Sequence, residues 1–297
     1  MKNNQFMKKW LEEIEQYLVS MIDGLPSHQE KLQSAMKHVV VGGGKRIRPM
    51  LVLASAQVCG AKPKDVLPAA CALEMIHTYS LIHDDLPGMD DDSMRRGKPT
   101  IHVLYDEATA ILSGDAFLTI AFEAICQTKE VEAKNLVQMV QALSKASGAR
   151  GMIAGQMLDI ASEEQSLTLE ELKQIHQEKT GKLIQVAMQI GCLAGNPSNS
   201  TKEALEDFAT HYGLAFQIQN DLQDVLWDSQ KTGKETGKDQ ALEKNTYPSL
   251  MGIAGAKLAL EEEVMACQKS IEQLPLTSDE QLEAAQFLAD SLQYLTI

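Results

Sequence analysis

The feature that most restricts the fold of this chain is the spacing of its apolar residues, which recur at the helical period of about 3.6 along most of its length. The strand-like alternation of apolar and polar residues is scarce. Long segments rich in Ala, Leu and Met, such as 107–125 and 203–227, carry the helical pattern. The opening helix is expected to bury one face, made of Phe6, Trp10, Ile14, Tyr17, Leu18 and Met21. We therefore predict an all-α fold, a large helix bundle that forms one domain over residues 1–297.

Short polar signals divide this pattern into separate helices. Four capping boxes predict helix starts: Ser27–Glu30, Thr168–Glu171, Ser200–Glu203 and Thr277–Glu280. Breaks are expected at Gly42–Gly44, Pro87–Gly88, Gly195–Asn199, Ser229–Lys244 and Pro275. The segment Ser229–Lys244 has little apolar content, so we predict a mobile loop there and no boundary between domains.

Composition and charge exclude several classes of partner. The chain has 297 residues, a formal net charge of -14 and a sequence pI of about 5.0. This balance argues against nucleic acid and anionic membranes, and an anionic ligand would need locally placed cations. No signal peptide and no apolar run of membrane-spanning length are recognised, so stable membrane insertion is not expected and the cytoplasm is the expected location. The five cysteines are interpreted as small core residues of a protein in a reducing compartment.

The first candidate site lies where an apolar, helix-compatible run ends in a group of carboxylates. Residues 81–100 read LIHDDLPGMDDDSMRRGKPT. Clustered carboxylates repel one another, so a hard divalent cation is their most plausible companion. Asp84, Asp85 and Asp90 are the candidate ligands, because the break at Pro87–Gly88 lets Asp90 turn back toward the same cation. The arginines that follow suit a polyanion held by the same metal, such as a diphosphate. A solvated acidic helix end is the simpler alternative.

A second polar patch occurs far downstream, within FQIQNDLQD at 216–224. Asn220, Asp221 and Asp224 fall on one face of a helix that is otherwise apolar. Buried carboxylates without partners are costly, but two patches that face each other across metal ions and phosphate compensate each other. We expect Mg²⁺ there, in up to three ions, with Mn²⁺ as a substitute. A buried polar patch without metal remains the alternative interpretation.

With both patches in view, the chain resembles the short-chain trans-polyprenyl diphosphate synthases, most of all the bacterial farnesyl diphosphate synthases. The resemblance runs from about residue 42 to about residue 247. Its landmarks occur in the family order: GGKRIRP at 43–49, His77, the two acidic motifs, RRGKPT at 95–100, GQMLD at 155–159, KTG at 179–181 and KNTYP at 244–248. The resemblance implies a bundle of the isoprenoid synthase type with a deep central cavity, and a homodimer. Asn220 departs from the family pattern, which usually has an aspartate there.

The resemblance also assigns the basic residues. It implies that isopentenyl diphosphate binds at Lys45, Arg48, His77 and Arg96. It implies that the allylic diphosphate binds at Arg95, Lys179, Thr180, Gln217, Lys234 and Lys244. For His77, a role as a core histidine is the alternative. Tyr79, with Ser80 beside it, lies about 7.5 Å before Asp84 along a helix, in the path of a growing prenyl tail.

The resemblance thus implies a Mg²⁺-assisted prenyltransferase. It would condense isopentenyl diphosphate with dimethylallyl and geranyl diphosphate to give (E,E)-farnesyl diphosphate. In the family, an aromatic residue at the position of Tyr79 goes with products of farnesyl size. A geranylgeranyl diphosphate synthase, and a weakly active or non-catalytic partner subunit, are the alternatives left open.

Overall fold

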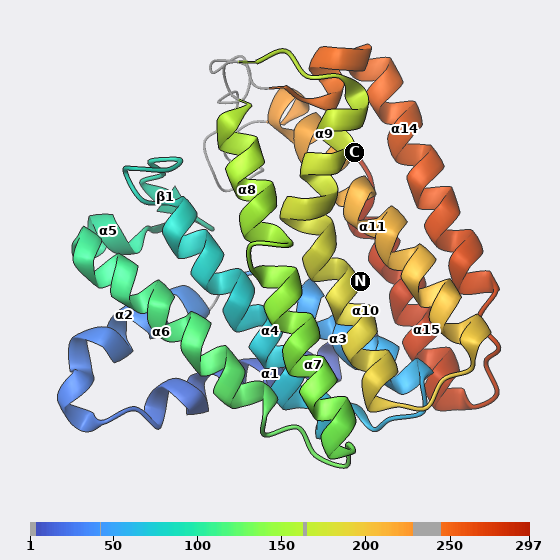
Figure 1. Cartoon of the computed structure of the whole chain (residues 1–297), viewed down its shortest axis with the longest axis horizontal. Coiled ribbons are helices and arrows are strands. Elements are labelled where there is room, and N and C mark those ends of the chain that lie inside the picture. The colour runs from blue at the N-terminus through green and yellow to red at the C-terminus, as the bar shows by residue number, and fades with distance from the viewer. Residues whose placement is uncertain (1–3, 42, 163–164, 228–244) are drawn as a thin grey trace.

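The protein is almost entirely helical in the computed structural model, which describes residues 4–41, 43–162, 165–227 and 245–297 (Figure 1). The main helices are α1 (Gln5–Asp23), α2 (Glu30–Val40), α3 (Ile47–Val58), α4 (Pro63–Asp84), α5 (Ile101–Leu104), α6 (Glu107–Ile125), α7 (Ala133–Ser147), α8 (Met152–Ala161), α9 (Leu169–His176), α10 (Lys182–Ala194), α11 (Asn199–Leu226), α14 (Tyr247–Glu272) and α15 (Asp279–Ser291). Shorter turns are η1 (Ser27–Gln29), η2 (Gln177–Gly181, a π-helical turn) and η3 (Leu292–Leu295). The strands described are β1 (Met94–Arg95) and β2 (Lys98–Pro99), which pair antiparallel in one short hairpin. The predicted all-α fold is confirmed.

The inner helices are those whose sequences are apolar on every side. In α3 every residue except Arg48 is buried, and in α4 fourteen residues from Pro63 to Ile82 are buried. A helix that is apolar all round must be enclosed by other elements. Accordingly α4 packs against both α3 and α6, and α3 also packs against α10. α11 packs against α14 and α10, and α10 also contacts α3 and α4, so the two helices that carry the acidic motifs belong to one bundle.

Helix starts follow side-chain caps, but only one of the four predicted boxes is used as expected. Thr168 and Glu171 form a reciprocal capping box at the start of α9, as predicted. The boxes predicted at Ser27, Ser200 and Thr277 are wrong. The N-caps of α11 and α15 are the serines two residues before and one residue after the predicted positions, Ser198 and Ser278. In each case the serine hydroxyl oxygen accepts a hydrogen bond from the N–H three residues later. α11 therefore begins two residues earlier than predicted, and the capping box of α15 pairs Ser278 with Gln281.

α6 corrects the expectation that no apolar run is long enough to cross a membrane. Among the described residues, this one helix is long and apolar enough to span a membrane. The mean hydropathy of its most apolar 18-residue stretch is 1.4, and 39% of that stretch is buried. Its buried side packs against α4, which accounts for part of its apolar content. Its outer side exposes Ile111 and Leu112, with 44% and 60% of their surface accessible.

Candidate functional site

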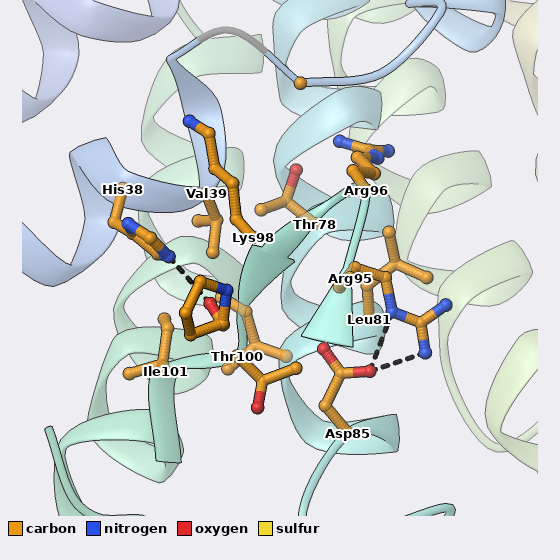
Figure 2. A pocket seen from close by; sticks show the side chains of 13 residues that line it. His38, Val39, Thr78, Leu81, Asp85, Arg95, Arg96, Lys98, Thr100 and Ile101 are labelled. Atoms are coloured by element: carbon orange, nitrogen blue, oxygen red, sulfur yellow. Dashed lines mark hydrogen bonds and ion pairs between the residues drawn. The ribbon is translucent and has the colours of Figure 1, made fainter. Parts of the chain in front are cut away.

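The first acidic motif lies where α4 ends. The N–H of Asp90 donates to the carbonyl of Asp84 at 2.9 Å, so the Pro87–Gly88 turn brings the third carboxylate back to the helix end, as predicted. Asp85 is the most buried of the three, with 5% of its surface exposed. Arg95 holds it: Nε donates to Asp85 Oδ1 at 2.7 Å, and Nη2 lies 2.5 Å from the same oxygen (Figure 2). Arg95 is thus a structural neighbour of the motif in this state.

Electrostatics at the end of α4 favour binding of a cation. Burial raises the pKa of Asp84 from 3.8 to about 6. The nearby carboxylates of Asp90 and Asp85 act in the same direction. Lys179 and Arg95 oppose this shift without cancelling it. Burial is the largest of these causes, so the ionised carboxylate of Asp84 is held at a cost that a bound cation would offset.

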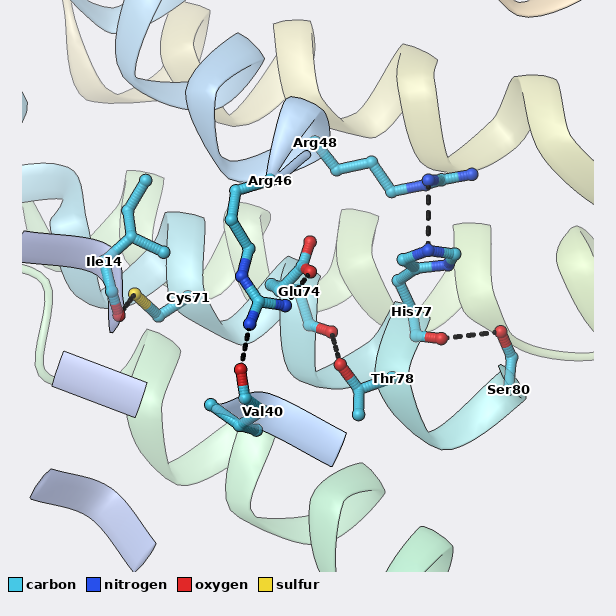
Figure 3. Close-up of polar contacts among 9 residues, drawn as sticks. All are labelled: Ile14, Val40, Arg46, Arg48, Cys71, Glu74, His77, Thr78 and Ser80. Atoms are coloured by element: carbon cyan, nitrogen blue, oxygen red, sulfur yellow. Dashed lines mark hydrogen bonds and ion pairs between the residues drawn. The ribbon is translucent and has the colours of Figure 1, made fainter. Parts of the chain in front are cut away.

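Seven residues earlier on α4, the charge is reversed. His77 is surrounded by guanidinium groups. Its pKa lies well below the usual value, first because the imidazole is buried and then because of the positive charges of four arginines: Arg48, Arg96, Arg95 and Arg46. The imidazole is therefore neutral at pH 7, and it accepts a hydrogen bond from Arg48 Nη1 at 3.2 Å (Figure 3). Cations gathered this closely in a chain of net charge -14 indicate a binding site for a polyanion.

Arg46, like Arg95, is neutralised within the protein. Its Nη1 donates to Glu74 Oε1 at 2.8 Å, its Nη2 donates to the carbonyl of Val40, and both charged side chains are almost fully buried (Figure 3). Neither Arg46 nor Glu74 was assigned a role from the sequence. A single carboxylate at position 74, inside the apolar run 66–76, was the available signal. Through Arg46, the end of α2 at Val40 and the start of α3 are both linked to Glu74 of α4.

Gly43 and Gly44 allow the side chain of Arg96 to approach the backbone that precedes α3. Gly44 has a φ of +90°, and a Cβ on it would lie 2.7 Å from the guanidinium carbon of Arg96. No other residue would fit at position 44 without moving Arg96. Lys45, next in the chain, places its Nζ 4.7 Å from the ring centre of Tyr294 in η3, a contact that the sequence analysis did not anticipate. The carbonyls of Tyr294 and Thr296 accept from Gln219 Nε2, which ties the C-terminal residues to α11.

The hairpin that carries Arg95 and Arg96 covers a small cavity of about 40 Å³ (Figure 2). His38 Nε2 lies 2.8 Å from the carbonyl of Pro99 and links α2 to the hairpin. At this size the cavity has room for a few water molecules and is too small for a prenyl diphosphate. Its lining includes Asp85, Thr78 and Thr100, which shows how closely the hairpin packs on α4.

The second motif is only partly exposed. Asn220 Nδ2 donates to Gln217 Oε1 at 3.2 Å, while Asp224 is buried with 7% of its surface exposed. Asp221 has a different environment: its Oδ2 accepts from the backbone N–H of Tyr247 at 2.9 Å and lies 3.3 Å from His176 Nε2.

Asp221 therefore anchors the start of α14 to α9 and α11, with the rings of Tyr247 and His176 stacked 5.9 Å apart. From the sequence, Tyr247 appeared only within the KNTYP landmark and without a role, and His176 was not named. Their contact with Asp221 could not be predicted, because it depends on the packing of three helices.

Lys179 connects the first motif to this side of the bundle. It bonds to Asp159 at 2.6 Å, and its charge is also felt by Asp84 and Asp90. A Cβ on Gly155 would overlap the backbone of Lys179, so the glycine lets α8 touch η2. η2 in turn packs against α11, which carries the second motif. Thr180 is buried in the same turn, whereas Lys234 and Lys244 lie outside the described residues.

Tyr79 and Ser80 differ in how they use their hydroxyl groups. Tyr79 is 5% exposed, and its hydroxyl is buried without a hydrogen-bond partner in the described part of the chain. Burial and the charge of Asp84 raise its pKa to about 12. Ser80 donates to the carbonyl of His77 at 2.9 Å, within its own helix. Because α4 is helical from Pro63 to Asp84, Tyr79 lies on the same helix as Asp84 and five residues before it, as its spacing predicts.

The described residues contain no group of three His, Cys, Asp or Glu side chains already converged on one point. Mg²⁺ does not require such a group, because it keeps waters and is usually held by one or two carboxylates plus substrate phosphates. The partly buried carboxylate of Asp84, with Asp90 turned back beside it, fits a divalent cation of this kind.

Known proteins resemble this chain over most of its length. The family model described as "Polyprenyl synthetase" matches residues 29–281. Farnesyl diphosphate synthases of Haemophilus influenzae and Geobacillus stearothermophilus are 42% and 44% identical, covering 88% and 90% of this chain and 90% of each relative. A crystal structure of a geranyltransferase from Helicobacter pylori, complexed with magnesium and isoprenyl diphosphate, superposes with a TM-score of 0.85 at 32% identity. That comparison covers 99% of this chain and 98% of the other.

Proposed function

Since this chain belongs to the polyprenyl synthetase family, we propose that it is a prenyltransferase that makes (E,E)-farnesyl diphosphate from isopentenyl diphosphate and dimethylallyl diphosphate, by way of geranyl diphosphate. The farnesyl synthases that match nine-tenths of its length at more than 40% identity support this assignment. A geranylgeranyl product is the second candidate. Which of the two products forms depends on Tyr79, the residue that we propose limits chain length.

One observation carries the proposal. Along α4, a cluster of cations around His77 and a cluster of carboxylates around Asp84 are separated by about two helical turns, or roughly 10 Å. A lone diphosphate would need only the first cluster, and a lone metal would need only the second. The presence of both clusters on α4 suits two diphosphates, one of which is bound through metal.

The residues for Mg²⁺ are Asp84, Asp85 and Asp90 on the α4 side and Asn220, Asp221 and Asp224 on the α11 side. Among them, Asp221 already accepts from two protein donors, and Asn220 brings no charge. We therefore assign the larger share of metal binding to the α4 side and to Asp224. When bound, the metal supplies Lewis-acid stabilisation of the charge that develops on the leaving diphosphate.

The basic residues have two separate tasks. We assign the diphosphate of isopentenyl diphosphate to Arg48 and Arg96, together with Lys45 and the neutral His77, which accepts a hydrogen bond from Arg48. Lys179, Thr180 and Gln217, with Lys234 and Lys244, are assigned to the allylic diphosphate. Arg95 is assigned there too, once it exchanges Asp85 for substrate phosphate.

The reaction then needs no nucleophile from the protein. The C–O bond of the allylic diphosphate breaks, and the terminal alkene carbon of isopentenyl diphosphate bonds to the allylic carbon. A proton is lost to the departing diphosphate. The apolar interior around α3 and α4 keeps water from the cationic carbon. We propose that the growing prenyl chain occupies a deep central cavity of the bundle.

Tyr79 is proposed to end chain growth at fifteen carbons. Its ring is buried on α4 about 7.5 Å before Asp84, so a tail that grows down the bundle from the metal-bound diphosphate meets it. Ser80 beside it is small and leaves the ring as the limiting group.

Incubation of the purified protein with Mg²⁺, dimethylallyl diphosphate and radiolabelled isopentenyl diphosphate tests the proposal, with products sized after phosphatase treatment. Farnesol is expected as the main product. Geranylgeraniol would establish the second candidate instead, and no incorporation would reject both and leave a non-catalytic partner subunit. The matched control is Lys37→Ala, which removes an exposed cation paired with Asp23 and should leave product size unchanged.

We further propose one domain, a cytoplasmic location and a homodimer formed through the outer side of α6. The described residues share one buried apolar cluster, which supports the single domain. The exposed Ile111 and Leu112 on an apolar helix support an interface with a second copy. Sedimentation of wild-type protein and of Leu112→Glu tests this, because the charged variant should shift the dimer toward monomer.

A further inference from the structure

Two cysteines that are 133 positions apart in the sequence meet where the C-terminal ends of α3 and α10 pack together. Cys59 is the residue that follows α3, and Cys192 lies in the last turn of α10. Their sulfurs are 3.8 Å apart, with the Cys59 thiol as donor to Cys192 Sγ. Both are reduced in this structure. The buried Cys71 and Cys267 instead donate to backbone carbonyls of Ile14 and Phe208.

The backbones on both sides of this pair are already close enough for a bond. A Cβ on Gly191 would overlap Ser55 and Ala56 of α3, and a Cβ on Gly195 would overlap Cys59 itself. Asn196 N–H donates to the carbonyl of Cys59 at 3.1 Å, which fixes the chain after α10 against the end of α3. A disulfide needs the sulfurs about 1.8 Å nearer than they are, at about 2.05 Å. Rotation of the two side chains can supply that movement with the helices in place.

The two thiols are also unequal, as in reactive dithiols. The hydrogen bond from Cys59 lowers the pKa of Cys192, and the charge of Lys202 acts in the same direction, while burial and Glu206 oppose them. Cys192 is partly exposed, whereas Cys59 is 6% exposed. The thiolate is the attacking species, so Cys192 is the accessible nucleophile and Cys59 is the partner held next to it.

We propose that Cys59 and Cys192 form a redox-modification site, a dithiol that closes to an intramolecular disulfide when the protein meets a small-molecule disulfide. The Cys192 thiolate attacks one sulfur of the oxidant and releases the first thiolate. Cys59 then loses its proton and attacks Cys192 Sγ in the mixed disulfide, and the second small thiolate leaves. The sum is two protein thiols plus one disulfide giving one protein disulfide plus two small thiols.

The bridge joins the ends of α3 and α10 that are far from the candidate site. Arg48 lies at the other end of α3, about 16 Å from Cys59 along the helix axis, and Thr180 precedes the other end of α10. The disulfide should therefore leave the diphosphate-binding residues in place. Its effect is on stability, because it closes a loop of 133 residues and restricts the unfolded chain. For a chain of this length, the chain-entropy effect corresponds to a rise of about 8 °C in the melting temperature.

The test treats the full-length protein with glutathione disulfide and measures its melting temperature; a second portion is denatured, its remaining thiols are blocked with N-ethylmaleimide, and its intact mass and peptide map are measured. Three adducts in place of five, a Cys59–Cys192 peptide and a melting temperature about 8 °C higher that dithiothreitol reverses are expected. The matched control Cys126→Ser, which removes an exposed thiol, should keep all of these changes apart from its own adduct.

The variants Cys59→Ser and Cys192→Ser should each lose both the bridge and the rise in melting temperature. If Cys59→Ser does not fold, Cys192→Ser gives the same result from a partly exposed position. Thiol loss at Cys126 alone would overturn the proposal. So would a mixed disulfide that persists at Cys192, or a bridge that leaves the melting temperature unchanged. None of these readouts uses prenyl transfer, so their failure is separate from a failure of the proposed activity.

Discussion

Replacement of Asp84 by asparagine should make the protein more stable and nearly inactive. In the absence of metal, Asp84 is a charged group held at the end of α4 beside Asp90 and Asp85, and burial and these neighbours raise its pKa from 3.8 to about 6. A raised carboxyl pKa means that the charged form is disfavoured in the folded state. A shift of that size corresponds to about 3 kcal/mol at neutral pH. Because asparagine must also lose water on burial, we expect a gain of roughly 1–3 kcal/mol.

The pH dependence of this gain is fixed by its sign. The folded state binds a proton at Asp84 more tightly than the unfolded state does, so the wild-type protein gains stability from this group as the pH falls through about 6. The difference between Asp84→Asn and wild type should be full at pH 7 and vanish near pH 4. For a chain of this length, it should raise the melting temperature at pH 7 by about 2–5 °C.

Thermal unfolding of metal-free wild type, Asp84→Asn and the control Asp91→Asn between pH 4 and 7.5 measures this, with steady-state assays alongside. Asp91 is exposed and has a φ of +48°, a conformation that asparagine tolerates, so its variant should stay near the wild type. Activity of Asp84→Asn should fall at least about 100-fold, because a metal ligand is lost. A lower melting temperature for Asp84→Asn, or a difference that does not change with pH, would refute the electrostatic reasoning.

Three other substitutions test separate parts of the account. Tyr79→Ala should move the main product beyond fifteen carbons by sizing of the alcohols, and an unchanged farnesyl product would mean that another residue stops the chain. Asn220→Asp should lower the Mg²⁺ concentration for half-maximal activity several-fold, since it adds charge to the α11 side; an unchanged metal titration would show that Asp224 already suffices. Glu74→Gln should destabilise the fold by about 3–5 kcal/mol, because it leaves the Arg46 charge buried without its partner, and denaturant unfolding measures that loss.

Local pattern was enough to predict the fold class and several elements. The segment 107–125 becomes α6 with the same bounds, and the break at Pro87–Gly88 returns Asp90 to Asp84 as expected. These features depend on residues within one or two turns of each other. Helix starts were harder to predict, because Ser198 and Ser200 can each cap a helix, and only the structure shows that Ser198 accepts from the N–H of Thr201 and starts α11 two residues earlier.

Contacts between distant segments could not be predicted from the sequence. The spacing of Asp221 places it on the polar face of α11, but only the packing of α9 and α14 gives it His176 and the N–H of Tyr247 as partners. The contacts of Lys45 with Tyr294 and of Cys59 with Cys192 likewise join segments more than a hundred residues apart. Basic residues near the motif were found by resemblance, whereas the neutralisation of Arg46 by Glu74 needed the fold.

The central claim is that the acidic ends of α4 and α11 share cations with one diphosphate. A crystal structure with Mn²⁺ and an allylic thiolodiphosphate, with the metals located by anomalous scattering, tests it most directly. Metal peaks should lie between Asp84 or Asp90 on one side and Asp224 on the other, with the diphosphate in contact with both metal groups and with Lys179. Metals bound to α4 alone, or a diphosphate bound elsewhere, would contradict it.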